Sequence, residues 1–345
     1  MPTKHATLYR TYRPTTFAEM RGQEHIVGAL TQAIKGGSIA HAYLFSGGRG
    51  TGKTTAARIL AHALNVTDKD IIEIDAASNR GIDDIRELRE GVWVFPFESP
   101  YKVYIIDEAH MLTKEAWNAL LKTLEEPPAH AIFILATTER DKVPDTIQSR
   151  CEVYTFRQPS REILSEMIQR IAKQEGYTIE PAGVELIALL AEGSFRDAQS
   201  ILQKVLGSSS EKKITVTHIE SVTGAPRGEI IRTFLTALGE GDTATALGVI
   251  QIAVREHIDM RTFTRLIIHR LRAVLLSRFD PASGATHTRE LTEADLETIA
   301  TLAKNKAITS DTLRAILEAY STMSYAAVPS LPLELAVMDI APKVA

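Results

Sequence analysis

Short, largely apolar runs alternate with segments that predict helices in the first half of the chain. The runs occupy residues 42–45, 71–74, 103–106, 131–135 and 152–156. Runs of this kind are typical of strands buried on both faces of a parallel sheet. Apolar spacing, charge order and capping residues predict helices at 53–65, 82–90 and 114–124. The alternation from residue 42 to 156 therefore predicts an α/β domain, with a parallel sheet flanked by helices.

The pattern changes after Pro159. Segments 160–176, 181–192 and 194–207 predict three helices with short connections, and 207–213 is a candidate linker. From about Pro226 onward, apolar stripes at helical spacing predict helices that pack on one another, one of them after a capping pattern at Thr292. We therefore expect three domains: an α/β domain at 1–158, a small helical domain at 159–224 and an all-helical domain at 225–345.

The composition is that of an ordinary globular protein, with 345 residues, 44% hydrophobic and 24% charged. A net charge of −4 does not indicate nucleic-acid binding over the whole surface, so any DNA contact would be a local patch. Cys151 is the only cysteine, which excludes a disulfide framework and a cysteine-rich zinc site. The first residues lack the apolar core of a signal peptide, and no run approaches a membrane span. We expect a cytoplasmic protein without membrane contact.

The first apolar run leads into a glycine-rich turn that predicts a phosphate site. Gly47-x-x-x-x-Gly52-Lys53-Thr54 matches the P-loop pattern between a predicted strand and helix. In such loops backbone N–H groups surround phosphate, the lysine reaches the β- and γ-phosphates, and the hydroxyl binds Mg²⁺. The candidate ATP-binding residues are Gly47, Gly48, Gly50, Thr51, Gly52, Lys53, Thr54 and Thr55. The alternative is a glycine loop that matches by chance.

Two carboxylates follow the run at 103–106, where open α/β sheets place their ligands. We expect Asp107 to hold Mg²⁺ with Thr54, and Glu108 to polarise the water that attacks the γ-phosphate. The alternative is an acidic strand end without function. Because a P-loop precedes this pair, the two motifs together favour ATP hydrolysis.

Further stretches resemble a known family. The motif order resembles the AAA+ ATPases, and specific segments are similar to the gamma/tau subunits of the bacterial DNA polymerase III clamp loader. The resemblance runs from about residue 8 to the end and is densest up to about residue 205. The segments that carry it are 12–17, 22–25, 74–81, 118–128, 136–139, 149–151, 193–198 and 331–336.

The resemblance implies roles for further residues. Thr138 would be the sensor that reads the γ-phosphate, and Arg196 would reach the phosphates from a helical lid. Arg13 and Pro14 would line the adenine pocket. Arg150 would be an arginine finger that completes the ATP site of a neighbouring subunit; the alternative for Arg150 is an ordinary surface ion pair.

The resemblance also implies the function and the partners. The chain would be an ATP- and Mg²⁺-dependent motor that opens a sliding clamp and loads it onto primed DNA during replication. It would assemble with delta, delta prime and further gamma/tau copies, and the DNA-polymerising activity of the holoenzyme would reside in other subunits. The domains at 159–224 and 225–345 would then be the ATPase lid and the oligomerisation collar.

Two departures from the family pattern limit what it implies. The family usually carries a four-cysteine zinc module after the P-loop helix, whereas residues 66–70 here contain no cysteine, so we expect no zinc. The acidic extension of the long tau form is not in the sequence. We expect either a short gamma-like protein or a tau chain cut at this boundary, and neither polymerase nor helicase contacts are implied.

Candidate DNA contacts lie around the helix predicted after residue 81 and on the helix predicted after residue 113. Arg80, Arg86, Lys114 and Lys122 are cations that the resemblance places along the duplex. The alternative is four solvated surface charges, with Arg86 paired to Asp83 on its own helix.

Three other functions stay open at this point. A branch-migration helicase would have a C-terminal winged helix, which the helical stripes after Pro226 disfavour. A scaffold that binds ATP without hydrolysing it is disfavoured by Lys53, Asp107 and Glu108. A small-molecule P-loop kinase would need an acceptor pocket, and nothing in the sequence resembles one.

Overall fold

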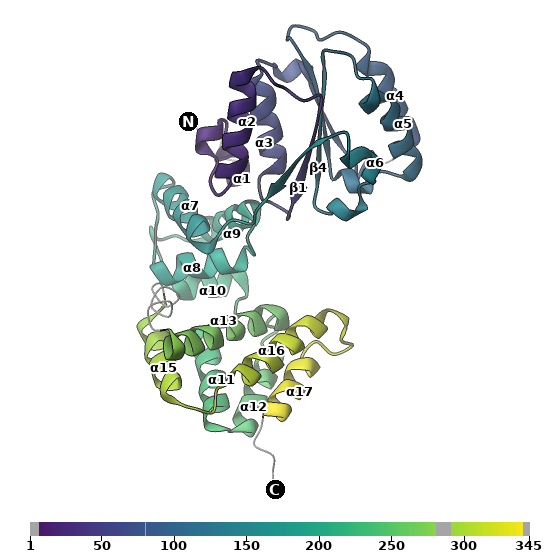
Figure 1. Ribbon diagram of the computed structural model, residues 1–345. Coiled ribbons are helices and arrows are strands. Elements are labelled where there is room, and N and C mark those ends of the chain that lie inside the picture. The colour runs from purple at the N-terminus through teal and green to yellow at the C-terminus, as the bar shows by residue number, and fades with distance from the viewer. Residues whose placement is uncertain (1–6, 80, 281–290, 341–345) are drawn as a thin grey trace. The chain divides into compact units, whose positions relative to one another are not determined.

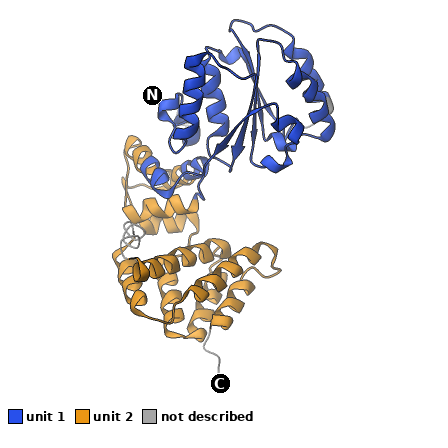
Figure 2. Ribbon diagram, in the orientation of Figure 1, with its two compact units in different colours: residues 1–167, 191–200 blue, residues 168–190, 201–345 orange. Residues whose placement is uncertain are grey.

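The computed structural model describes residues 7–79, 81–280 and 291–340. Contacts divide the chain into two compact units, residues 1–167 with 191–200, and residues 168–190 with 201–345 (Figure 2). The predicted domain limits near 158 and 224 follow the sequence pattern and remain predictions. Within the described residues, no helix combines the length and the apolar character needed to span a bilayer.

The first unit is built on a five-stranded sheet with the order β2-β3-β4-β1-β5, and every pairing is parallel. The strands are β1 Ala42–Gly47, β2 Ile71–Asp75, β3 Lys102–Asp107, β4 Ala131–Thr137 and β5 Glu152–Phe156. The predicted α/β class is confirmed. Register pairs Asp75 with Asp107 and Ser46 with Thr137, so the polar ends of these strands lie along one edge of the sheet.

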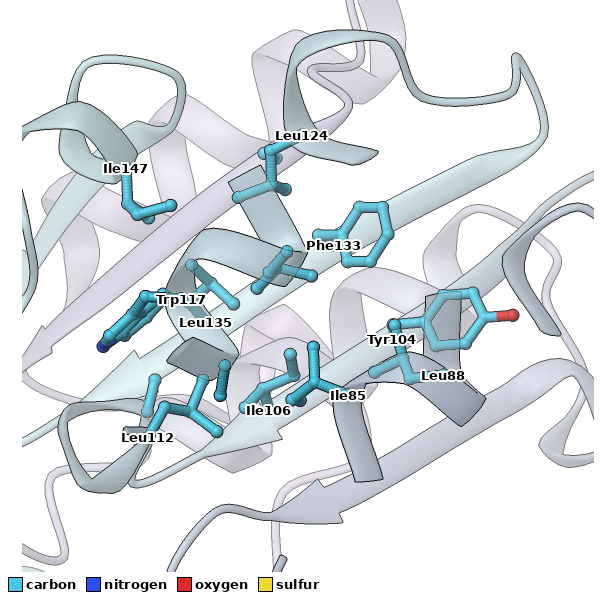
Figure 3. Close-up of a cluster of buried hydrophobic side chains, with 14 of the residues drawn as sticks. Ile85, Leu88, Tyr104, Ile106, Leu112, Trp117, Leu124, Phe133, Leu135 and Ile147 are labelled. Atoms are coloured by element: carbon cyan, nitrogen blue, oxygen red, sulfur yellow. The ribbon is translucent and has the colours of Figure 1, made fainter. Parts of the chain in front are cut away.

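Alternating side chains of the central strands explain why their sequences are apolar throughout. In β1, Ala42 and Leu44 join one buried cluster, while Tyr43 and Phe45 join another on the opposite face. Helices α2 (Glu24–Gly36) and α3 (Lys53–Ala63) cover the face of Tyr43 and Phe45. Helices α4 (Ile82–Val92) and α5 (Lys114–Glu125) cover the other face (Figures 1 and 3). Both faces of the sheet are thus buried, as the sequence predicts.

Short elements connect these layers. The hydroxyl of Thr113 accepts a hydrogen bond from the N–H of Ala116 at 3.2 Å, which confirms the predicted N-cap of α5. The short elements are α1 Leu8–Thr11, α6 Asp145–Gln148 and the 3-10 turns η1 Phe17–Glu19, η2 Asp68–Asp70, η3 Ala109–Met111 and η4 Arg140–Lys142.

The three helices predicted after Pro159 are present as α7 Arg161–Gln174, α8 Pro181–Leu190 and α9 Phe195–Ser208. Of the predicted linker 207–213, residues 209–212 lie between α9 and a short strand, while 207–208 end the helix and Lys213 begins the strand. That strand, β7 (Lys213–Ile214), pairs in parallel with β6 (Thr178–Ile179), and α10 (Val216–Thr223) follows it. The sequence pattern does not predict this two-stranded sheet, because two residues per strand show no periodicity.

The rest of the second unit is helical, as predicted. Its elements are α11 Gly228–Glu240, α12 Thr243–Arg255, α13 Met260–Phe279, α15 Glu293–Lys304, α16 Ser310–Thr322, the 3-10 turn η5 Met323–Tyr325 and α17 Leu331–Ile340. Phe234 and Phe263 pack edge to face in its core, with ring centroids 5.7 Å apart. The hydroxyl of Thr292 accepts from the N–H of Asp295 at 3.2 Å, which confirms the predicted cap of α15.

Candidate active site

The loop between β1 and α3 has a backbone that only glycine accommodates without strain. Gly47 has φ of 147° and Gly50 has φ of 69°, both in the region that side chains disfavour. A side chain at Gly47 would collide with the backbone of Phe156 in β5. Thr51 is fully buried, and its hydroxyl donates to the carbonyl of Gly48 at 2.9 Å, which fixes the curve of the loop. The N-terminal end of α3 begins at Lys53, directly after this loop.

Lys53 is buried within the loop. Its Nζ donates to the carbonyl oxygens of Gly47 and Gly48, both at 2.9 Å. Burial lowers the pKa of the Lys53 ammonium, while the charges of Glu108 and Asp107 oppose this effect. The side chain is therefore held inside the loop, beside the predicted phosphate position.

Thr54 and Asp107 meet across the two motifs. The Thr54 hydroxyl donates to Oδ2 of Asp107 at 2.7 Å. Thr54 is the second residue of α3, and Asp107 ends β3. Magnesium prefers oxygen ligands, and in P-loop sites a Ser or Thr hydroxyl and an aspartate hold it. The pair that the sequence assigns to Mg²⁺ is thus brought together, with the donor chemistry that this ion requires.

Glu108 has an unusual backbone and a constrained carboxylate. Its φ of 48° lies in the left-handed region, which costs free energy for a residue with a side chain. Its N–H donates to Oδ1 of Asp107 at 3.0 Å, and the Thr138 hydroxyl donates to its Oε2 at 3.1 Å. The structure thus joins the predicted catalytic carboxylate to the predicted sensor.

His110 belongs to the same cluster, although the sequence pattern does not single it out. Its side chain is 7% exposed, and Nδ1 lies 3.1 Å from the Thr137 hydroxyl. The ring nitrogens lie 3.5 Å from Oε2 of Glu108 and 3.4 Å from Oε1 of Glu139. The signal was a histidine two residues after the carboxylate pair, but only the parallel pairing of β3 and β4 brings Thr137 to it.

The start of α9 contacts the P-loop within the first unit. The N–H of Phe195 donates to the carbonyl of Gly50 at 3.0 Å. The next residue, Arg196, places its guanidinium over the ring of Tyr9, 5.1 Å from the centroid. The predicted lid residue therefore follows directly after a backbone contact with the phosphate loop.

The N-terminal segment is also tied to the P-loop helix. Arg13 is half-buried, and its Nε donates to the hydroxyl of Thr55 at 3.0 Å. Pro14 beside it is half-buried as well. This contact fits the predicted position of both residues at the edge of a nucleotide pocket, while their contact with adenine remains a prediction.

Arg150 has partners outside this cluster. One of its nitrogens lies 2.6 Å from Oε1 of Glu125 at the end of α5, and another donates to the carbonyl of Thr146 at 2.6 Å. The ion pair that the sequence analysis gave as the alternative is therefore present. The action of Arg150 on a neighbouring subunit remains a prediction.

The candidate DNA contacts lie on α4 and α5, which pack side by side (Figure 1). Arg86 is exposed and pairs with Asp83 at 3.1 Å, as the alternative interpretation predicts. Lys114 and Lys122 are exposed on α5. Arg80 lies outside the described residues.

The connection that stands where the family carries a zinc module is held by Asp70. Its carboxylate is buried and accepts from the N–H groups of Phe97, Glu98 and Ser99 at 2.6 to 3.0 Å. Burial alone would raise the pKa of Asp70, but these hydrogen bonds together lower it. Within the described part of the chain, no group of three or more Cys, His, Asp or Glu side chains is arranged to hold a metal ion. The absence of zinc remains a prediction.

Comparisons with known proteins agree with the resemblance. Family models match residues 65–160, as DNA polymerase III, delta subunit, and residues 163–210, as DNA polymerase III clamp loader subunit, ATPase lid domain. The gamma/tau subunit of Mycobacterium tuberculosis is 38% identical over 301 residues, which cover 81% of this chain and 52% of the relative. The tau subunit of Bacillus subtilis is 40% identical, over 79% of this chain and 52% of the relative, and that of Escherichia coli is 36% identical, over 80% and 46%. The chain thus spans about half the length of these relatives.

A comparison of structures agrees on the fold. The Thermotoga maritima RuvB Holliday junction branch migration motor superimposes with a TM-score of 0.53. The sequence identity is 24%, and the match covers 66% of this chain and 79% of that protein. At this identity the likeness concerns the fold alone, and it agrees with the predicted parallel sheet flanked by helices.

Proposed function

The chain belongs to the gamma/tau family of DNA polymerase III subunits, and from that premise we propose that it is an ATP-driven motor subunit of a clamp loader. It hydrolyses ATP to open a sliding clamp and to place the clamp on primed DNA in the cytoplasm. Its partners in this proposal are delta, delta prime and further gamma/tau copies. The synthesis of DNA belongs to other subunits of the holoenzyme.

The convergence of the two motifs carries the proposal. Thr54 meets Asp107 at 2.7 Å, and Thr138 meets Glu108 at 3.1 Å, both beside the loop that encloses Lys53. A site that only bound ATP would need the loop but would have no use for a water-polarising carboxylate linked to a sensor. Hydrolysis therefore fits the geometry better than binding alone.

Each residue has a role in this proposal. The backbone of the P-loop and the ammonium of Lys53 bind the β- and γ-phosphates. Thr54 and Asp107 hold Mg²⁺, which when bound neutralises charge on the phosphates. Glu108 orients and polarises the attacking water, and Thr138 holds the carboxylate of Glu108 by a hydrogen bond.

Two arginines act at the edges of the site. Arg196 reaches the phosphates from the start of α9, a role supported by the Phe195–Gly50 backbone contact. Arg150 leaves its ion pair with Glu125 when a neighbouring subunit is seated and completes the charge around that subunit's ATP. Hydrolysis would then report assembly, because a lone chain lacks one cation of its transition-state site.

The test is ATP turnover by the full chain alone, with partner subunits, and with partner subunits plus clamp and primed DNA. We expect slow turnover alone and strong stimulation in the complete mixture. ATP binding without turnover in any mixture would support the scaffold alternative instead. Stimulation by four-way DNA junctions, with no response to the clamp, would favour a branch-migration motor.

A further inference from the structure

We propose that His110 is a positioning residue for Glu108 and that Glu139 orients the His110 ring. The inference rests on the proposed function, since it concerns the same hydrolysis. Its basis is a buried imidazole that lies between two carboxylates, one of which is the proposed catalytic group.

The contacts on Glu108 select one of its two oxygens. The Thr138 hydroxyl lies 3.1 Å from Oε2, and Nδ1 of His110 lies 3.5 Å from the same oxygen. The side chain of Glu108 is 36% exposed, so water reaches it. With Oε2 held from two sides, Oε1 is the oxygen left to accept a hydrogen bond from the attacking water.

The His110 ring is itself held in place. Nδ1 lies 3.1 Å from the Thr137 hydroxyl, and that hydroxyl accepts the N–H of Glu139 at 3.0 Å. Nε2 faces Oε1 of Glu139 at 3.4 Å, and Glu139 pairs with Lys142 at 2.9 Å. Thr137 at the end of β4 and Glu139 just before η4 thus face the two ring nitrogens, and rotation of the imidazole would break contacts on each side.

The backbone of Glu108 explains why such support is needed. Its left-handed conformation points the side chain away from the ordinary path of a strand end, and this conformation is costly for glutamate. A long side chain on a strained backbone has several rotamers, and only some present a carboxylate oxygen to water at the γ-phosphate. Contacts that hold Oε2 exclude the unproductive rotamers before ATP binds.

The test uses full-length His110→Ala, His110→Gln and Glu139→Gln in the assembled clamp loader with clamp and primed DNA. Loss of a group that orients a metal ligand typically costs about 10- to 100-fold in activity, and by analogy we expect a fall of about this size in kcat for His110→Ala. The Kd for ATP and the KM should stay unchanged, because the P-loop contacts do not involve His110. His110→Gln, whose amide can donate to Oε2, should recover part of kcat, and Glu139→Gln should lose less than His110→Ala.

Two controls separate positioning from structure. His130 is another half-buried histidine of the first unit, which contacts the carbonyl of Val92 at 3.0 Å and no catalytic group. His130→Ala should leave kcat unchanged. In a Glu108→Gln background, His110→Ala should cause no further loss in single-turnover hydrolysis, because its effect acts through Glu108.

The outcomes are distinct. Weakened ATP binding in His110→Ala, no recovery in His110→Gln despite an unchanged melting temperature, or additive losses with Glu108→Gln would overturn the positioning role. If the wild-type protein hydrolyses ATP and all His110 variants hydrolyse it at the same rate, this inference is overturned and the proposed function stands. Absence of wild-type turnover in every mixture would overturn both.

Discussion

Two regions of the first unit differ in where their side chains find partners. The phosphate edge is the end of the sheet that carries the P-loop, Asp107 and Glu108. The outer face is the exposed surface of the layer formed by α4, α5 and α6. At the phosphate edge, Thr54 and Glu108 each contact a side chain that another motif supplies, and Lys53 donates to carbonyl oxygens of its own loop. On the outer face, Lys114 and Lys122 are exposed, and Arg86 pairs with Asp83 of its own helix. Contacts within the chain hold the side chains of the phosphate edge, whereas any function of the outer face depends on other molecules.

Arg150 belongs to both regions in this comparison. Its ion pair with Glu125 places it beside α5, yet its proposed action is on a phosphate site. The difference between the regions therefore shows which residue roles can be inferred from contacts within a single chain. Residues assigned to the chain's own site contact other groups of that site, whereas Arg150, which is proposed to serve a neighbouring subunit, contacts Glu125 and Thr146.

Replacing Arg150 should give the largest effect and sharpen the comparison most. An arginine finger supplied in trans is worth roughly 10³–10⁵ in rate, so Arg150→Ala should lose stimulated ATP turnover by about that factor. ATP binding should be nearly intact, because Arg150 contacts no group of its own phosphate loop. Turnover in the assembled complex and the Kd for ATP are the measurements. Loss of ATP binding in this variant would count against the role.

Replacing Glu108 should give the next largest effect. General-base and water-orienting groups contribute typically about 10²–10⁴ in rate, so Glu108→Gln should slow hydrolysis by a factor in that range. The amide keeps the size of the side chain, so ATP should still bind and the clamp-bound state should accumulate. Single-turnover hydrolysis and gel filtration with the clamp measure this. Wild-type turnover in Glu108→Gln would break the assignment of the phosphate edge.

Replacing Lys53 should weaken binding itself. A hydrogen bond to a charged group contributes about 1.5–3 kcal/mol, which corresponds to a loss of roughly 10- to 150-fold in ATP affinity for Lys53→Ala. Titration with a fluorescent ATP analogue measures the change. Arg49→Ala is the matched control, since Arg49 is an exposed cation on the same loop. Equal losses in both variants would indicate a charge effect without a specific contact.

Replacing the cations of the outer face should give the smallest effect. If Lys114 and Lys122 contact phosphates, their joint replacement by Ala should lower the slope of DNA affinity against salt by about 2 and reduce DNA-stimulated turnover. Binding to the clamp alone should not change. Arg21→Ala with Lys35→Ala removes the same charge from other exposed positions and serves as the control. Equal slopes in the two double variants would mean that the outer face is solvated surface.

The sequence predicts the phosphate edge well because its geometry follows from the backbone. A strand, a glycine turn and a helix place Lys53 and Thr54, and a buried parallel strand places Asp107 at the same edge. The helices and strands of the α/β part follow from the same periodicity. Each of these predictions needs only local pattern and the rule that parallel strands end together.

What the sequence does not predict depends on contacts between distant segments. His110 acquires its surroundings from the register of β3 against β4, and Glu125 becomes the partner of Arg150 only when α5 and α6 pack together. The left-handed backbone of Glu108 cannot be predicted from the sequence, because glutamate normally avoids this conformation. The β6–β7 pair escapes notice because one buried isoleucine per strand is too little for a pattern.

Mixing two inactive chains tests the central claim most directly, namely that this chain's own residues bind ATP and a neighbour's Arg150 completes the site. The Lys53→Ala chain keeps the arginine but cannot bind ATP well, and the Arg150→Ala chain keeps the phosphate loop but lacks the arginine. Assemblies that contain both chains, with partner subunits, clamp and primed DNA, should hydrolyse ATP far faster than assemblies with either chain alone. A rate in the mixture equal to the average of the two separate rates would contradict the account.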